Sequence, residues 1–337
     1  MDAFDRVYGA LKGHYVDRPP ILSQIGDHAG IINNIPYCTM YKDAKKAALA
    51  HLKTLSLYGY DITTIQVEPS WPVAEACGAK VNYPLDKNPW ITTYLINSDK
   101  DLEVLEMPNF LATKSSRVMI EGTNLLADEA NVPVAAFMTG PLTFSLQLMP
   151  YKQLIIKLVK DHDFANKLVE YSVKVIKAYI KLLKQAGATI LVLCEHDFQM
   201  LKPELIKTYS LKFLKEIFEI YNYNIFHICG NVSLLLQDLA FELKQLKKLN
   251  MISIGHLVDI SNTLKIFSPK IGVAGNIDHI KLLPNGSPKE IEKAVENAIN
   301  ASAGTYRYMV APGCEITADT PIENVKALVN ATKKNSY

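Results

Sequence analysis

Short apolar runs alternate with longer segments of helical period along most of the chain, most regularly from about residue 130 onward. Each run ends in a polar, glycine or proline cluster, and continuous apolar runs are typical of parallel strands that are buried on both faces. Two further runs occur nearer the N-terminus. The pattern therefore predicts eight strands, at 21–25, 62–65, 132–138, 189–194, 225–229, 251–254, 272–274 and 308–311.

The segments between these runs have the 3.6-residue period of helices. Pro203 and Pro321 stand where the first turn of a helix tolerates proline, and each is followed by an acidic residue that suits the positive end of the helix. Residues 67–130 are rich in turn formers and predict a long insertion after the second strand, with extra short elements. The predicted helices cover 43–58, 164–186, 203–221, 232–248, 288–301 and 321–334, with a weaker pattern at 262–267.

Eight strands that alternate with helices can form an open doubly wound sheet or a closed barrel. No Gly-x-Gly-x-x-Gly turn follows the first strand, which favours the barrel. A chain of 337 residues suits one such barrel, although length alone also allows two domains. Because no repeat or flexible linker divides the chain, we predict one domain over residues 1–337. It has an α/β fold, a (β/α)₈ TIM barrel with an N-terminal extension and a long insertion after strand two.

Composition limits the classes of partner. The 36 basic and 34 acidic residues are interspersed, so the chain lacks the one-sided basic surface of a nucleic-acid binder. No uncharged run is long enough to span a membrane, and the first residues lack the pattern of a secretory signal. We therefore expect a cytoplasmic protein that binds neither nucleic acid nor membrane. Its five cysteines, odd in number and far apart, are then free thiols or metal ligands.

The strongest chemical signal is His227-Ile-Cys229-Gly at the end of a predicted strand. Residues i and i+2 of a strand face the same way, so the imidazole and the thiol project together. Cys314 follows the last predicted strand and should reach the same end of the barrel. Two thiolates and one imidazole favour zinc and leave its fourth position open, as in a catalytic site. The alternative is a chance pair of core residues.

Other polar residues fall at the predicted carboxyl ends of strands. Each can orient a bound ligand or support the metal ligands by a hydrogen bond. The alternative is a structural role, as a helix cap or as a hydrogen-bond partner within a loop. Thr139-Gly-Pro141 begins a helix whose amides can receive an anion. The candidates for cofactor binding are Gln24, Asp27, Glu68, Glu195, His196, His256, Asp259 and Asn276.

Four motifs together resemble the uroporphyrinogen decarboxylase superfamily: the run from His227 to Asn231, Gly275-Asn-Ile, Ala311-Pro-Gly-Cys-Glu-Ile, and Thr320-Pro-Ile-Glu-Asn. The resemblance extends back to Arg18-Pro-Pro and is strongest to the methylcobamide:coenzyme M methyltransferase branch. It implies a (β/α)₈ barrel in which His227, Cys229 and Cys314 hold zinc.

In that branch, a thiol such as coenzyme M binds the zinc, loses its proton and attacks the methyl group of a methyl-Co(III) corrinoid. The resemblance thus implies zinc as cofactor, a methylated corrinoid as co-substrate, and a corrinoid protein and a small thiol as partners. One difference bears on the acceptor: His256 stands where an acidic residue is expected in coenzyme M enzymes.

Three other functions stay open from the sequence. The chain can act upstream, moving a methyl group from a small donor onto the corrinoid, or it can be a non-catalytic barrel that binds a corrinoid protein. Decarboxylase activity is disfavoured, because the arginines of the decarboxylases' Arg-Gln-Ala-Gly-Arg motif are replaced by Ser23 and Asp27.

Overall fold

Six parallel strands form the main sheet, and each is hydrogen-bonded to the next in chain order. We describe residues 1–335, taken from a computed structural model. The strands are β3 Ala135–Thr139, β4 Ile190–Glu195, β5 Tyr223–Ile228, β6 Leu249–Ile254, β7 Gly272–Ile277 and β8 Tyr308–Pro312. A separate antiparallel pair consists of β1 Lys80–Asn82 and β2 Trp90–Thr93.

Two short segments close these six strands into a ring. Ile21 pairs in parallel with Val310 of β8, Leu22 with Ile62, and Thr63 with Val134 just before β3. The predicted barrel is therefore confirmed, with 21–22 and 62–63 in the places of strands one and two. Both are much shorter than the predicted strands. The first follows two prolines that offer no N–H to a ladder, and Gln24 has a φ of 46°, which ends the extended backbone.

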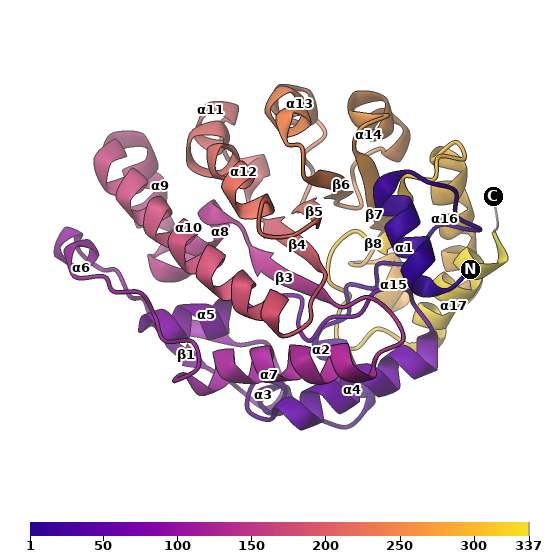
Figure 1. The fold of residues 1–337 in the computed structure, drawn as a ribbon, viewed down its shortest axis with the longest axis horizontal. Helices are drawn as coiled ribbons and strands as arrows, with labels where there is room; N and C mark the ends of the chain where they lie inside the picture. The colour runs from indigo at the N-terminus through magenta and orange to yellow at the C-terminus, as the bar shows by residue number, and fades with distance from the viewer. Residues whose placement is uncertain (336–337) are drawn as a thin grey trace.

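Helices surround the strands on the outside (Figure 1). In chain order the helices are α1 Ala3–Lys12, α2 Asp27–Ile32, α3 Tyr37–Met40, α4 Ala44–Tyr58, α5 Ser70–Cys77, α6 Asp99–Glu103, α7 Lys114–Glu129, α8 Pro141–Leu148, α9 Tyr151–Lys160, α10 His162–Gln185, η1 Phe198–Met200, α11 Pro203–Ile206, η2 Lys207–Leu211, α12 Lys212–Phe218, α13 Leu236–Gln245, α14 Ile260–Phe267, α15 Leu282–Asn285, α16 Pro288–Ala301 and α17 Ile322–Lys334.

Two expectations about helices need correction. The segment 67–130 holds more than short elements, because α7 is a helix of 16 residues that packs against α4 and α5. The helix predicted at 203–221 is interrupted by a π-helical turn, η2, at Lys207–Leu211. That turn brings Ser210 to the carboxylate of Glu195, a contact that sequence periodicity does not reveal.

The core has two layers. Side chains inside the ring form one cluster, which includes Ile190, Ile225 and Met251, while alternate side chains of the same strands pack outward against the helices. Helix α1 closes the amino-terminal end of the barrel, because Val7 and Leu11 belong to the inner cluster. The opposite, carboxyl end is thereby left as the end at which a site can form.

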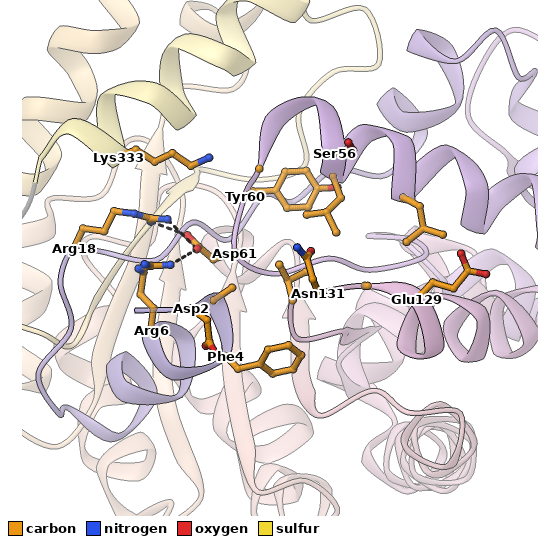
Figure 2. Close-up of a pocket in the computed structure, with 16 residues that line it drawn as sticks. Asp2, Phe4, Arg6, Arg18, Ser56, Tyr60, Asp61, Glu129, Asn131 and Lys333 are labelled. Atoms are coloured by element: carbon orange, nitrogen blue, oxygen red, sulfur yellow. Dashed lines mark hydrogen bonds and ion pairs between the residues drawn. The ribbon is translucent and has the colours of Figure 1, made fainter.

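The amino-terminal end is also held by charge. The Asp61 carboxylate is buried and pairs with Arg6 and Arg18, at 2.9 Å and 2.8 Å (Figure 2). A cavity of about 880 Å³ opens beside this cluster, with Lys333 on its wall. Breaking a buried pair of this kind leaves an uncompensated charge, so we assign the cluster a structural role. None of the helices within residues 1–335 is long and apolar enough to cross a membrane.

Candidate metal centre

His227 projects into the carboxyl end of the barrel because of its position on β5. It has the same parity as Ile225, which lies in the inner cluster, whereas Phe226 and Ile228 face the helices. Ser253 of β6 pairs in register with His227 and so faces the same space. The alternation of the strand thus directs the imidazole inward, as the sequence predicts.

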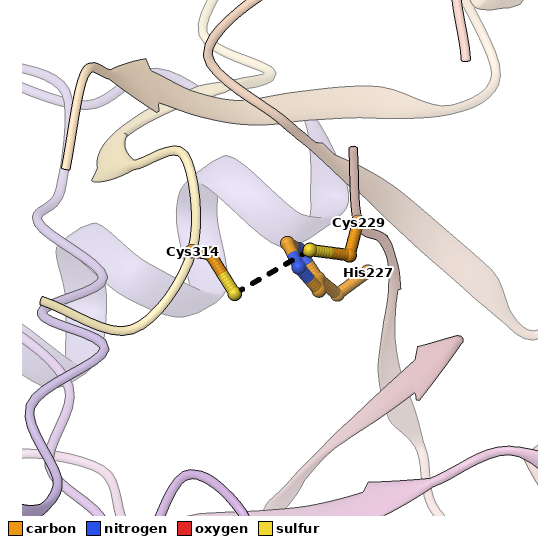
Figure 3. Close-up of side chains that lie close together, drawn as sticks. All are labelled: His227, Cys229 and Cys314. Atoms are coloured by element: carbon orange, nitrogen blue, oxygen red, sulfur yellow. Dashed lines mark hydrogen bonds between the residues drawn. The ribbon is translucent and has the colours of Figure 1, made fainter. Parts of the chain in front are cut away.

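Cys229 follows β5, the strand of His227, and Cys314 follows β8, and the three side chains meet at the carboxyl end of the barrel (Figure 3). The Sγ atoms of Cys229 and Cys314 are 3.6 Å apart, and one ligand atom from each of the three residues lies within 4.8 Å of the others. Zinc–sulfur bonds of about 2.3 Å at a tetrahedral angle place two sulfurs about 3.8 Å apart. The observed separation is therefore close to that of two thiolates on one zinc ion.

The imidazole of His227 is oriented for the same task. Its Nδ1 lies 2.9 Å from the hydroxyl of Ser253, while its Nε2 is buried and has no hydrogen-bond partner among the described residues. When Nδ1–H donates to Ser253, the lone pair of Nε2 points at the two sulfurs. A buried nitrogen without a partner is costly, and a metal ion at this point satisfies it.

The two thiols do not share the same protonation. The hydrogen bond with Cys314 lowers the pKa of Cys229, as do its contacts with His196 and His227, against the effect of burial. The same hydrogen bond, together with burial, raises the pKa of Cys314. These opposite shifts favour one thiolate beside one thiol, an arrangement that suits a cation.

Two glycines let the loops that carry these ligands approach one another. A Cβ atom on Gly313 would lie 2.5 Å from the backbone nitrogen of His256, and one on Gly255 would lie 2.4 Å from the carbonyl oxygen of Gly230. Neither backbone contact leaves room for a side chain. Gly313 and Gly230 each adjoin a cysteine of the centre, so the close packing fixes where the sulfurs lie.

Glu68 and His196 lie beside the cysteines. The Nε2 of His196 is 3.3 Å from Oε2 of Glu68, and Ser70 donates its backbone N–H to Oε1. Burial lowers the pKa of His196, but the contacts with Cys229 and Glu68 outweigh it and raise that pKa well above the usual value. This imidazolium can donate to a thiolate, so the two residues adjoin the predicted centre.

Glu195 does not face the metal centre. It follows Cys194 on β4 and has outward parity, and its carboxylate accepts from the backbone N–H groups of Leu142 and Thr143 and from the hydroxyls of Thr143 and Ser210. The N-terminus of α8, expected to receive an anion, thus receives the chain's own Glu195. Burial raises the pKa of Glu195, against these four hydrogen bonds.

Three further candidates hold loops in place. Gln24 donates to the carbonyl oxygen of Pro312 at 2.9 Å, beside the loop of Cys314. Asn276 donates to the carbonyls of Gly255 and Val258, and Asp259 accepts from Asn262 N–H as the N-cap of α14. The amide donors of Gln24 and Asn276 and one carboxylate oxygen of Asp259 are occupied within the protein, which favours a supporting role over ligand contact.

His256 lies against the backbone of Gly313, in the loop that carries Cys314. Its ring is 5.3 Å from that of His279, centroid to centroid, and its Nε2 is 3.9 Å from Asp278. The Nδ1 of His279 is buried without a hydrogen-bond partner among residues 1–335. Burial and the neighbouring His256 lower the pKa of His279, which favours a neutral imidazole.

Asp27 lies next to Glu315. Its backbone N–H donates to Oε1 of Glu315 at 3.3 Å, and its own carboxylate accepts from Gln66. Burial raises the pKa of Asp27 to about 6. Glu315 was not among the candidate residues from the sequence, although its position directly after Cys314 was a signal.

Ser253 and His279 were also missed. Ser253 can be found from strand parity, because it lies two residues after an apolar position of the inward face of β6. His279 follows β7 at the carboxyl end of the barrel, where a polar residue is a candidate by position alone.

Comparison with known proteins indicates the family of the chain. The profile of the uroporphyrinogen decarboxylase (URO-D) family matches residues 2–335. A methylcobamide:CoM methyltransferase (MtbA) of Methanosarcina mazei is 24% identical over 352 residues, covering 99% of this chain and 98% of that protein. A methylcobamide:CoM methyltransferase (MtaA) of Methanosarcina barkeri is 25% identical over 349 residues, covering 97% of this chain and 96% of that protein.

A solved structure of a methyltransferase from Methanosarcina mazei superimposes with a TM-score of 0.88, at 22% identity, over 99% of both chains. This likeness shows a shared fold. The resemblance drawn from the motifs is confirmed, and the names of these relatives match the branch that the motifs indicate. The chain therefore belongs to the uroporphyrinogen decarboxylase (URO-D) family.

Proposed function

We propose that this protein is a zinc-dependent methyltransferase that moves a methyl group from a methyl-Co(III) corrinoid, carried by a corrinoid protein, to a thiol. The observation that carries the proposal is the set of His227, Cys229 and Cys314, with an unpartnered buried Nε2 and sulfurs 3.6 Å apart. Relatives named methylcobamide:CoM methyltransferase support the same reaction.

The residues present fit a zinc ion. Two thiolates and an imidazole are the ligands that zinc prefers, and three protein ligands leave one position for a substrate. When bound, the ion supplies a positive charge that lowers the pKa of a thiol at the open position. Ser253 fixes the ring of His227, and the loops of Gly255 and Gly313 fix the cysteines.

The proposed reaction balances without a further reactant. The carbon–sulfur bond forms as the cobalt–carbon bond breaks, the electron pair of that bond stays on cobalt as Co(III) becomes Co(I), and the proton of the thiol is released. His196 lies beside Cys229, and the contacts with Cys229 and Glu68 raise the pKa of its imidazole well above the usual value, which favours the charged form. A fixed cation at this position stabilises thiolate over thiol.

A corrinoid must reach the centre from outside, and the rim of the barrel has the character of a docking surface. Met200, Leu234, Leu257 and Ile280 are 54–92% exposed, and each lies in the loop that follows a different strand from β4 to β7. We include this apolar rim in the proposal as the contact surface for the corrinoid protein. Leu234→Asp should impair transfer from the corrinoid protein far more than transfer from free methylcobalamin.

Uroporphyrinogen decarboxylation is disfavoured. A substrate with eight carboxylates needs cationic groups, but the segment 23–27 here ends in the buried acid Asp27, and Ser23 donates to the carbonyl oxygen of Ile62. Incubation with uroporphyrinogen should leave it unconsumed.

The test combines metal analysis with methylcobalamin demethylation, followed by the absorbance of Co(I) and by the methyl thioether formed. We expect about one zinc per chain and thiol-dependent turnover. Cys229→Ala and Cys314→Ala should lose both. Cys38→Ala, which removes a half-buried cysteine outside the centre, is the matched control and should keep both. Zinc-free protein with full turnover would overturn the proposal.

A further inference from the structure

The two sulfurs of the candidate metal centre are also close enough to react with each other. Figure 3 shows the Sγ atoms of Cys229 and Cys314 facing one another, and they are 3.6 Å apart. A disulfide bond is about 2.05 Å long, so the two atoms need to approach by only about 1.5 Å to be joined. Among residues 1–335, no other pair of cysteine sulfurs is in hydrogen-bond contact.

The surroundings of the two cysteines permit this approach. Both side chains are half-buried, and neither belongs to the inner cluster that fills the barrel. The backbone contacts of Gly255 and Gly313 hold the two loops in place, so the sulfurs must approach by rotation about the Cα–Cβ bonds of the cysteines. A small oxidant in solvent can reach half-buried sulfurs at the open end of the barrel.

A third cysteine lies near this pair. Cys194 on β4 is paired in register with His227, belongs to the inner cluster, and interacts electrostatically with both Cys229 and Cys314. Its own sulfur is buried and contacts the carbonyl oxygen of Val192 at 3.9 Å. Geometry therefore favours a bond between Cys229 and Cys314, and Cys194 is the competing partner that a test has to exclude.

We propose that Cys229 and Cys314 form a site of reversible oxidation, at which a peroxide joins the two sulfurs and thereby removes two of the three proposed metal ligands. This inference rests on the proposed metal centre. Zinc binds cysteine as the thiolate, and the sulfurs of a disulfide no longer carry that charge. With His227 as its remaining ligand, the ion is released and methyl transfer stops.

The oxidation balances with hydrogen peroxide as the oxidant. One cysteine sulfur attacks an oxygen of the peroxide, the oxygen–oxygen bond breaks, and a sulfenic acid and one water molecule result. The second sulfur attacks the first, the sulfur–oxygen bond breaks, and the oxygen leaves as a second water molecule. The two sulfurs together lose two electrons, which reduce the peroxide, and the two thiol protons end in the water.

The same conditions act on the proposed reaction. Co(I), which forms when the methyl group leaves the corrinoid, is a strong reductant that a peroxide also oxidises. A thiol, the proposed acceptor, reduces a disulfide by thiol–disulfide exchange. The cysteine pair would therefore stop transfer when oxidant exceeds thiol and permit it again when thiol is abundant.

The test treats zinc-loaded protein with hydrogen peroxide. Zinc release is followed with a chromophoric chelator, and the disulfide is mapped by mass spectrometry of peptides prepared without reduction. We expect nearly all of the bound zinc to be released, in step with a peptide that joins Cys229 to Cys314. Dithiothreitol, followed by removal of the reductant and addition of zinc, should restore both thiols and the original zinc content.

Variants separate a bond between these two sulfurs from general oxidation. Cys314→Ala leaves Cys229 without a partner, so peroxide should convert Cys229 to the sulfinic acid, which dithiothreitol does not reverse. Cys194→Ala removes the competing partner, and Cys38→Ala removes a half-buried cysteine outside the centre. Both should form the same disulfide and lose zinc as the wild type does.

The outcomes separate this inference from the proposed function. Sulfinic acids at Cys229 and Cys314 without a cross-link, a disulfide that includes Cys194, or zinc that stays bound after the disulfide has formed would each overturn the inference, while the methyl transfer stands. Protein that binds no zinc before oxidation would remove the proposed metal centre instead. The peptide map of that protein would still decide whether peroxide joins the two sulfurs.

Discussion

Ser253→Ala tests whether the hydrogen bond behind His227 determines zinc affinity. The change removes only the hydroxyl that lies 2.9 Å from Nδ1, at a fully buried position. Without it, Nδ1–H has no acceptor in place, the ring loses its fixed orientation, and the other tautomer, with the proton on Nε2, becomes accessible. The backbone of β6 and all three proposed metal ligands remain.

The expected magnitude follows from this single contact. Loss of a residue that orients a metal-binding histidine reduces affinity by about 10–100-fold, which corresponds to about 1.4–2.8 kcal/mol. The removal of one buried hydrogen bond should also cost about 1–3 kcal/mol of folding stability. The protein should therefore fold but bind zinc more weakly.

The assay is a competition between the protein and a chromophoric zinc chelator at constant pH. Ser172→Ala is the matched control, because Ser172 is also fully buried and its hydroxyl pairs with Ser145 at 2.9 Å, away from the centre. It should lose stability without losing zinc affinity. Wild-type zinc affinity in Ser253→Ala would refute the role given to this hydrogen bond.

Three further predictions concern other groups. Glu195→Ala leaves the amide donors at the start of α8 and the hydroxyl of Ser210 without their buried acceptor. Thermal denaturation should therefore show a loss of folding stability of roughly 3 kcal/mol or more. An equal loss in Glu170→Gln, which removes an exposed carboxylate on α10, would contradict this interpretation. The pKa of Asp27 is raised by burial to about 6, above its unfolded value, so the stability that its protonated form contributes is present at low pH and lost as pH rises through about 6. The folding stability of Asp27→Asn relative to the wild type should therefore increase by roughly 3 kcal/mol between about pH 4 and pH 8. Denaturant titrations at several pH values measure this difference in stability. A difference that does not vary with pH would show that the raised pKa of Asp27 is wrong. Gly313→Ala places a Cβ atom 2.5 Å from the backbone nitrogen of His256, so the loop of Cys314 must shift. Competition with a zinc chelator should therefore show weaker zinc binding. Unchanged zinc affinity would mean that the close approach of Gly313 to His256 does not position Cys314.

Much of the barrel could be predicted because its central strands are buried on both faces and so appear as uninterrupted apolar runs. The first two strands could not be sized, since Leu22, Ile62 and Thr63 pair only through isolated bridges. The length of a paired strand depends on which backbone N–H groups find a carbonyl on the neighbouring strand. Pro19 and Pro20 show that two N–H groups are missing before the first strand, but they do not show where the pairing ends. That residues 1–337 form one domain stays a prediction.

The candidate site shows a similar division. The three candidate metal ligands could be placed together from strand ends alone, since carboxyl ends of parallel strands meet at one face. Glu195 was grouped with them although its parity directs it outward, because a strand end marks position but not direction. Glu315 and Ser253 had positional signals in the sequence, but the contacts of their side chains depend on the packing of neighbouring loops and strands, which one sequence does not reveal.

The most direct test of the central claim is the yield of Co(I) and methyl thioether from methylcobalamin, measured with zinc-loaded wild-type protein and with Cys314→Ala. The account predicts equal amounts of both products from the wild type when a thiol is present, none without thiol, and almost none from Cys314→Ala. Equal product formation by Cys314→Ala, with no zinc bound, would contradict the claim that His227, Cys229 and Cys314 form the catalytic metal centre.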